Sequence, residues 1–415
     1  NIKTGNRYRE FTALMRQQYD LGKKDSLVTD STVIPLFYPR LRFEHTLTYN
    51  VDKYQYFDFA TNADDTAFYQ NYDLVVHPGD SLRFRERWKN LTNDFSIYQF
   101  PDAKNLQQFV KLGAFIQNIS AQLGSGSQNF YNLVLHGEYR NKTRNHKWDA
   151  ELSGNLYTAG FNSGDYNAHI SLKRFVGRRG AGYAEIGFET VNRSPSFLYD
   201  PRSNYHLDSS AAGFKKENTT HIFASIYQPG LKLRLSGDYY LVSNYLYFHD
   251  YFHLGQYEPL FNLLQVSAQK IFRLGKHFNW YADVYVQQKT GAVPLNLPTL
   301  FTRNRLAFEG VFYRNLNLFT GIEVKYHTPY KADGYSPVLG QFFYQDSVTI
   351  TNRPDISAFL QFRIRGFKAF IRAENLNTMR VVNGSFGFTK NNLAAPGYPY
   401  PGLQIRIGIW WSFVR

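Results

Sequence analysis

The chain has 415 residues, no cysteine and a formal net charge of +14, so disulfides and cysteine-based metal sites are excluded. Its mean hydropathy is −0.43. It contains no run of 18 apolar residues, which excludes a transmembrane helix. Aromatic residues make up 18% of the chain, and side chains of this kind are enriched where an apolar surface meets water, as in the girdles of membrane barrels.

The basic excess, 47 Lys and Arg against 33 Asp and Glu, favours acidic partners such as lipopolysaccharide phosphates or anionic solutes. The basic residues are scattered rather than clustered, and no RNA-binding or helix-turn-helix signature is present. We therefore expect no nucleic-acid partner. A solvated basic surface explains the same excess equally well.

Segments that alternate between apolar and polar residues follow one another along the whole chain, while helical periodicity is nearly absent. The first, REFTALMRQQYDLG, places Phe11 and Ala13 on one side and Thr12 on the other. The pattern returns in RLRFEHTLTYNV, in the hairpin HKWDAELSGNLYT and YNAHISLKRF, and in LKLRLSGDYYLV, FNWYADVYVQQ, NLNLFTGIEVKYH, ISAFLQFRIRG and FKAFIRAENLN. About seventeen such strands of about ten residues are present, which is the segment length of a membrane barrel.

The last segment, GLQIRIGIWWSFVR, is predicted to be a strand with one apolar and one polar face. Its apolar set is Leu403, Ile405, Ile407, Ile409, Trp411 and Phe413. The other set contains Gln404, Arg406, Gly408, Trp410 and Ser412. Alternation alone does not decide whether the apolar set faces lipid or the core of a soluble β-sandwich.

The lengths of the connections decide between these two folds. Short links (PDAKN, RNKTRNH, VGRRGAG, QPG, RLGK, YRN and RG) alternate with links that are mostly long, at 56–90, 194–216, 246–260, 288–301, 328–352 and 377–401. Outer-membrane barrels have short periplasmic turns and long extracellular loops, whereas a Greek-key sandwich has no reason to keep that order. We therefore predict an all-β fold, a transmembrane antiparallel up-and-down β-barrel integral to a Gram-negative outer membrane. The apolar set of the last strand then faces lipid.

Residues 1–415 are predicted to form a single barrel domain without a plug domain. Strand parity makes the last strand run toward the periplasm, and the strand at 7–21 then runs in the same direction. Bacterial barrels have even strand numbers with both ends in the periplasm. Either the count of about seventeen is wrong by one strand, or an odd number of strands lies upstream of Asn1, and we favour the second explanation. The link at 23–37 is long although parity makes it periplasmic, so it is either a docking element or a strand extension.

Basic residues recur on the polar faces of the predicted strands and are candidates for lining the lumen. They are Lys232, Arg234, Arg303, Arg305, Arg363, Arg365, Arg372 and Arg406. Lys368 lies on the same faces, and Asp238, Asp283, Glu323 and Glu374 supply counter-charges. An open lumen with this wall attracts anions. The alternative is a ladder of ion pairs that fills a polar interior.

No residue pattern points to catalysis, a cofactor or a metal. In HDYFH, His249 and His253 lie about 13 Å apart on a strand, too far to share a metal, although a curled loop brings them together. We interpret them as polar residues of an aromatic loop, and we expect no enzyme activity. The loop at 328–352, with Tyr335, Phe342, Phe343 and Tyr344, either forms a constriction, docks a partner or packs on neighbouring loops.

Several stretches resemble the large putative porin family of Bacteroidota outer membranes. They are RYREFTALMRQQYDLG with FEHTLTYN, NLPTLF, GYSPVLGQFFYQD and the C-terminal AENLNTMRVVNGSFGFTKNNLAAPGYPYPGLQIRIGIWWSF. The resemblance implies a barrel in the outer membrane whose first strands are missing from this chain, and it brings no catalytic residues. The C-terminus also resembles the last hairpin of TonB-dependent transporters, which carry an N-terminal plug.

The leading expectation is passive diffusion of small polar solutes, including anions, through a basic lumen. The alternative is a non-conducting structural or accessory barrel within a larger outer-membrane complex, and a third interpretation is transporter-like uptake with a separate plug. The expected partners are outer-membrane lipid and lipopolysaccharide, small polar solutes, and other outer-membrane or periplasmic proteins. The solute itself is left open.

Overall fold

The computed structural model describes residues 3–28, 32–59, 61–123, 126–177, 181–205, 207–208, 213–382 and 385–412. Within these ranges, seventeen strands pair in an antiparallel up-and-down sheet. The chain divides into two compact units. The first unit contains residues 1–223, 240–262 and 336–343, and the second contains residues 224–239, 263–335 and 344–415.

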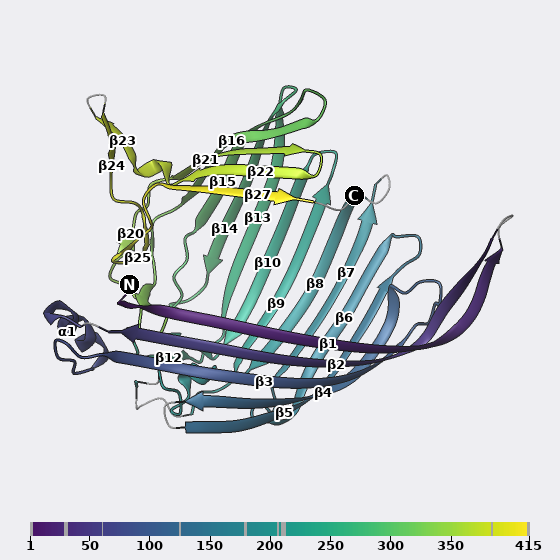
Figure 1. The fold of residues 1–415 in the computed structure, drawn as a ribbon, viewed down its shortest axis with the longest axis horizontal. Helices are drawn as coiled ribbons and strands as arrows, with labels where there is room; N and C mark the ends of the chain where they lie inside the picture. Colours follow the sequence, from purple (N-terminus) through teal and green to yellow (C-terminus); the bar gives the residue numbers. More distant parts are fainter. Residues whose placement is uncertain are drawn as a thin grey trace. The chain divides into compact units, whose positions relative to one another are not determined.

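In the first unit, eight consecutive strands each pair with the next one along the chain (Figure 1). They are β1 (Thr4–Val28), β2 (Val33–Asp58), β3 (Leu82–Gln99), β4 (Gln108–Leu123), β5 (Gly126–Lys142), β6 (Trp148–Gly160), β7 (Tyr166–Val176) and β8 (Gly182–Arg193). Strands β9 (Glu217–Gln228) and β10 (Leu233–Ser243) have residues in both units.

The second unit contains seven paired strands, apart from the first two residues of β13. They are β13 (Phe261–Leu274), β14 (Phe278–Lys289), β15 (Leu300–Phe312), β16 (Leu316–His327), β21 (Asp355–Ile364), β22 (Phe367–Glu374) and β27 (Gln404–Trp411). Each strand matches an alternating segment of the sequence, because period-two alternation suits a sheet with one apolar and one polar face.

The connections carry short elements. They are α1 (Ala63–Tyr69), η1 (Gln70–Tyr72), η3 (Phe197–Tyr199), β11 (Tyr245–Phe248), β12 (Leu254–Tyr257), β17 (Tyr330–Lys331), β18 (Gly334–Ser336), β19 (Gln341–Phe343), β20 (Thr349–Ile350), η4 (Leu376–Thr378), β23 (Met379–Val382), β24 (Ser385–Phe388), β25 (Leu393–Ala395) and β26 (Tyr398–Pro399). No helix in the described part of the chain is long and apolar enough to cross a membrane.

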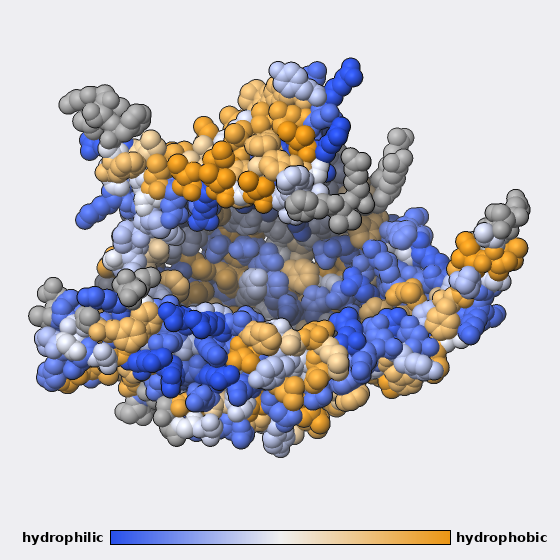
Figure 2. All heavy atoms as spheres, in the orientation of Figure 1, coloured by the Kyte–Doolittle hydropathy of each residue, from blue (hydrophilic) through white to orange (hydrophobic). Residues whose placement is uncertain are grey.

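The apolar face of the last strands is exposed, as the sequence predicts for a lipid-facing surface. Ile405, Ile407 and Ile409 are 66%, 69% and 69% exposed. Figure 2 shows hydrophobic residues gathered over β21, β22 and β27. Trp411 is exposed at the end of β27, Leu403 lies just before the strand, and Phe413 lies outside the described residues.

Tight turns at one end of the strands differ from the sequence prediction at two positions. Arg365 lies in the two-residue turn between β21 and β22 with φ 49°, and Lys232 lies in the turn before β10 with φ 48°. Both values are left-handed. This conformation suits the two-residue turn at Arg365 and the end of the four-residue turn 229–232 that closes with Lys232. The sequence predicts these residues on the polar faces of strands, and the turn geometry places them instead at the strand ends.

Long connections of the first unit pack together into a loop core, built from residues 63–76, 197–205, 207–208, 246–254 and 336–343. Its most buried side chains are Tyr56, Tyr69, Tyr72, Val76, Tyr205, Phe248, Phe252, Val338 and Leu339. Tyr69 donates a hydrogen bond of 2.7 Å to the buried Asp58 carboxylate. Burial raises the pKa of Tyr199, which packs against this core, to about 12, so its phenol stays neutral.

The aromatic loop at 328–352 contributes to this core. Phe343 packs against Tyr251 with ring centroids 4.9 Å apart. Val338 and Leu339 are buried in the core, while Phe342 remains exposed. Of the three interpretations of this loop, packing on neighbouring loops is the one that the structure supports.

The long link at 23–37 is a strand extension. Residues Gly22–Val28 of β1 pair with Val33–Pro39 of β2, whereas the pairing of β2 with β3 begins only at Leu41. The hairpin carries exposed apolar residues, with Val28 72% and Val33 64% exposed, and Figure 2 shows hydrophobic atoms near its end. A register shift at Gly22 marks where the hairpin leaves the sheet.

Gly22→Val is expected to destabilise this hairpin locally by about 1–3 kcal/mol, as overpacking does elsewhere. A Cβ at Gly22 would lie 2.1 Å from the Tyr38 backbone oxygen and 2.7 Å from the Pro39 Cα. Limited trypsin digestion in detergent micelles should then cut faster at Lys23 and Lys24. Gly237→Val is the control, because nothing lies within 4 Å of a Cβ there. Equal cleavage of both variants would contradict this account of Gly22.

Candidate functional site: a charged face and its pocket

Charged side chains of the second unit line up on the polar side of the sheet, here called the charged face. It is formed by Asp283 on β14, Arg303 and Arg305 on β15, Glu323 on β16, Arg372 and Glu374 on β22, and Arg406 on β27. Register places Arg303 directly opposite Asp283 and Arg305 directly opposite Glu323. Arg303 donates to Asp283 Oδ2 from Nε at 2.9 Å and from Nη2 at 2.7 Å.

Glu323 is the centre of the charged face. Its side chain is only 3% exposed. It accepts hydrogen bonds from Arg305 Nη2 at 2.8 Å and from Arg372 Nη2 at 2.6 Å. Two guanidinium groups thus compensate one buried carboxylate, the condition under which a buried charge is tolerated.

Glu374 continues this row of ion pairs to the last strand. Arg372 and Arg406 lie directly opposite each other on β22 and β27, an arrangement that destabilises a sheet unless a counter-charge intervenes. Glu374 supplies it, with its carboxylate 3.0 Å from Arg372 Nε and 2.9 Å from Arg406 Nε. Four of the predicted basic residues are therefore matched by carboxylates, which supports the ion-pair ladder for this part of the face.

Arg234 lies exposed on β10, and Asp238 lies on the same face of that strand four residues further on. Three of the four predicted counter-charges, Asp283, Glu323 and Glu374, are partners in the ladder. That the charged face lines a lumen stays a prediction.

Arg363 and Lys368 differ from the ladder residues. They lie directly opposite each other on β21 and β22, and no carboxylate of the described residues lies within 4.0 Å of either. Arg363 Nε donates to the backbone oxygen of Arg365 at 3.3 Å, and Lys368 Nζ lies 4.8 Å from the centroid of the Trp410 ring. Neither contact neutralises charge, so the pair leaves two unbalanced cations side by side.

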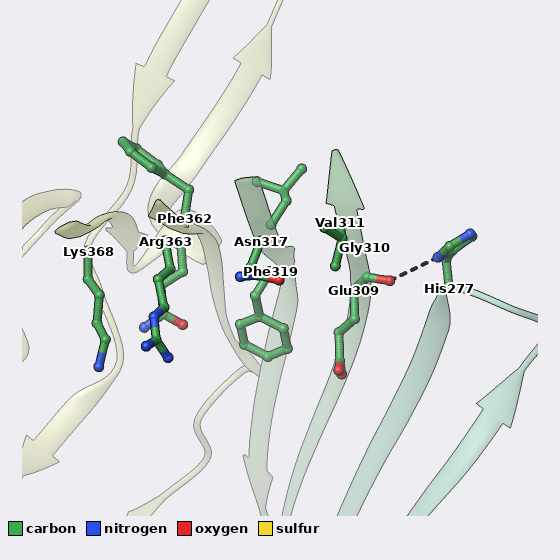
Figure 3. A pocket seen from close by; sticks show the side chains of 11 residues that line it. His277, Glu309, Gly310, Val311, Asn317, Phe319, Phe362, Arg363 and Lys368 are labelled. Carbon is green, nitrogen blue, oxygen red and sulfur yellow. Dashed lines mark hydrogen bonds between the residues drawn. The ribbon is translucent and has the colours of Figure 1, made fainter. Parts of the chain in front are cut away.

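These two cations border a pocket of about 670 Å³ at the short-turn end of the second unit. Its lining includes His277, Glu309, Asn317, Phe319, Gln361, Arg363 and Lys368. Figure 3 shows the side chains of Lys368, Arg363, Phe319 and Glu309 extending to the same side of the sheet, with Phe362 extending to the other. Asn317 lies directly opposite Arg363 and therefore shares its face.

Glu309 gives the pocket a negative end. Its Oε1 accepts a hydrogen bond of 2.9 Å from Asn279 and another from the Tyr281 hydroxyl. His277 Nδ1 lies 3.1 Å from the backbone oxygen of Glu309. The pocket thus has a carboxylate on β15 and two cations on β21 and β22, with Phe319 on the strand between them.

Sequence reasoning found Lys368 only as a polar-face residue, and it did not single out His277 or Glu309. A signal for the Arg363–Lys368 pair was nevertheless present. A two-residue turn at Arg365–Gly366 makes residues 363 and 368 partners across the hairpin. Glu309 carried no such signal, because its place beside the pair depends on how β15, β16 and β21 align.

The HDYFH segment forms a turn between β11 and β12. It brings the His249 and His253 rings together, with centroids 5.5 Å apart and planes 17° apart. His253 Nδ1 lies 3.1 Å from the Asp250 carboxylate. Among the residues that the structure describes, no group of three or more His, Asp or Glu is arranged to hold a metal ion.

The profile of the family described as "Putative porin" matches residues 1–414. The chain belongs to the putative porin family. The match covers nearly all of this porin-family chain, including the strands that build the charged face and its pocket. No curated protein matches the sequence.

Solved structures share the fold of this porin-family chain at low sequence identity. The ferric enterobactin receptor PfeA of Pseudomonas aeruginosa is 12% identical with a TM-score of 0.64, covering 99% of this chain and 62% of the receptor. The siderophore receptor PirA of Acinetobacter baumannii is 10% identical with a TM-score of 0.62, covering 99% and 63%. The copper transporter OprC is 12% identical with a TM-score of 0.61, covering 98% and 68%.

The porin-family chain thus spans about two thirds or slightly less of the length of these proteins. Their common fold is the antiparallel up-and-down β-barrel of the outer membrane. Together with the family match, it makes this chain an integral outer-membrane protein, as the alternating strands and connection lengths predicted.

Proposed function

We propose that the protein is a porin-like channel through which small polar solutes diffuse, with a preference for anions. The observation that carries the proposal is the Arg363–Lys368 pair, two neighbouring cations on the polar face without a carboxylate partner in the described residues. Unbalanced fixed charge in a narrow polar passage selects ions of the opposite sign. Each of the four ladder arginines contributes less to selectivity, because each is paired with Asp283, Glu323 or Glu374. These three carboxylates leave the ladder with one positive charge in excess.

Planar-bilayer recording across a salt gradient tests this proposal on the full-length mature protein. We expect stable current steps and a reversal potential that shows preference for chloride. The double variant Arg363→Glu and Lys368→Glu should move the reversal potential toward the cation and keep the steps. Lys215→Glu is the control, because Lys215 lies on a connection of the first unit and pairs with Glu258 there.

A silent bilayer would contradict the channel, provided that heat-modifiable gel migration shows folded protein. An unchanged reversal potential in the double variant would contradict the role of the pair.

The hairpin Gly22–Pro39 favours a second candidate, an accessory barrel subunit of a larger outer-membrane complex. Its Val28, Val33 and Ile34 side chains are exposed beyond the part of β2 that pairs with β3. Exposed apolar clusters of this kind mark interaction surfaces. A partner that co-purifies with the native protein and is lost when these three residues are changed to serine supports this candidate. An unchanged set of subunits argues against it.

A further inference from the structure

We infer that the pocket beside Arg363 and Lys368 binds short zwitterionic peptides, with the peptide carboxylate at the two cations and the peptide ammonium at Glu309. The inference deepens the proposed channel function, on which it rests for its role in permeation. It names a substrate class from the charges at the two ends of one pocket.

The positive end of the pocket requires an anion. Arg363 and Lys368 face each other across β21 and β22, and like charges in this position repel. A bound carboxylate relieves this repulsion, because a guanidinium and an ammonium can each donate a charge-assisted hydrogen bond to it. The Asn317 amide, opposite Arg363 on β16, adds a polar group beside the same position.

The negative end of the pocket attracts a cation. Within the described residues, the hydrogen bonds that Asn279 and Tyr281 donate to the Glu309 side chain both end on Oε1. The second oxygen of the carboxylate therefore remains available to a ligand on the pocket side. A simple inorganic anion forms no ion pair with Glu309. A molecule with an ammonium at one end and a carboxylate at the other can pair with Glu309 and with the two cations at the same time.

The separation of the two ends sets the length of the ligand. Glu309 on β15 is level with Gln361 on β21, two residues from Arg363. The backbone positions of Glu309 and Arg363 are therefore about 10 Å apart across the strands and about 7 Å apart along them, about 12 Å in all. An extended chain covers about 3.3–3.6 Å per residue, so a peptide of about three to four residues spans this distance. Phe319, between the two ends, offers an apolar surface to the middle of the peptide (Figure 3).

Equilibrium dialysis with labelled trialanine tests the inference on the full chain folded in detergent micelles. N-acetylation and C-terminal amidation of trialanine should each weaken binding at least about tenfold, which corresponds to 1.4 kcal/mol. Glu309→Gln should remove the penalty of N-acetylation and keep that of amidation. The double variant Arg363→Gln and Lys368→Gln should do the reverse. Lys325→Gln is the control, because Lys325 lies on the same face of β16 outside the pocket lining.

Binding that is indifferent to either cap, or no binding by protein whose gel migration shows that it is folded, would overturn the inference. Glu309→Gln keeps a hydrogen-bond acceptor for Asn279 and Tyr281, so it preserves the local fold. Because dialysis does not depend on conduction, the two proposals fail separately. A channel that conducts chloride without binding trialanine overturns the peptide site alone, and binding by a silent barrel overturns the channel alone.

Discussion

Glu323→Ala is expected to destabilise the second unit by about 3 kcal/mol, the lower part of the range for breaking a buried ion pair. The substitution leaves the Arg305 and Arg372 guanidinium groups beside each other without the carboxylate that both contact. The expected loss of stability lies at the lower end of this range because the Arg305 and Arg372 side chains are 27% and 24% exposed. Water therefore screens part of their charge. Urea titration in micelles, followed by tryptophan fluorescence, measures it.

Glu258→Ala provides the control for this experiment. Glu258 is likewise part of an ion pair, with Lys215, but both side chains are exposed. Its loss should change the free energy of unfolding by less than about 0.5 kcal/mol. If Glu323→Ala and Glu258→Ala unfolded at the same urea concentration, Glu323 would not be the centre of the charged face.

Tyr69→Ala is expected to open the loop core of the first unit at a cost of about 3–5 kcal/mol, as for other large aromatic truncations. The Tyr69 side chain is fully buried and its hydroxyl bonds both Asp58 and Tyr56. Hydrogen exchange followed by mass spectrometry should show faster exchange at residues 63–76 and 246–254. The strands β4–β7 should keep their protection, because none of their described residues belongs to this core.

Tyr69→Phe separates the packing of the ring from its hydrogen bonds. This variant keeps the ring and loses only the hydroxyl, which leaves Asp58 with the 2.9 Å hydrogen bond from Thr4. A cost of about 1–3 kcal/mol is expected for the weakened compensation of the buried carboxylate. If hydrogen exchange at residues 63–76 and 246–254 were as slow in Tyr69→Ala as in the native protein, the loop core would not be what holds these connections together.

The sequence predicted the sheet well because both of its signals are local. Period-two alternation gave the face of each strand, so that Ile405, Ile407 and Ile409 were assigned together to the apolar side. The alternation of short and long connections predicted that successive strands run up and down, each beside the next. Strand ends were less well predicted, since Lys232 and Arg365 adopt left-handed turn conformations that alternation does not detect.

The candidate site was predicted only in part, for a physical reason. Alternation shows that Arg305, Glu323 and Arg372 share a face, but register decides which pairs touch, and register depends on every turn between them. The sequence alone could not tell the matched arginines from the unmatched Arg363. The loop core was missed as a unit because its contacts join segments far apart in the chain, such as Tyr72 and Ser336.

That separation has a consequence for the order of assembly. The Tyr72–Ser336 hydrogen bond spans 264 residues, so the loop core closes only after most of the intervening strands have been inserted. Contacts of such long range form late, since the loss of chain entropy precedes any gain from packing. Before the loop core closes, the tyrosines and phenylalanines of its four connections remain unpacked and expose apolar surface. Exposed apolar surface of this kind makes an incompletely assembled chain prone to aggregation over the same interval in which its strands pair.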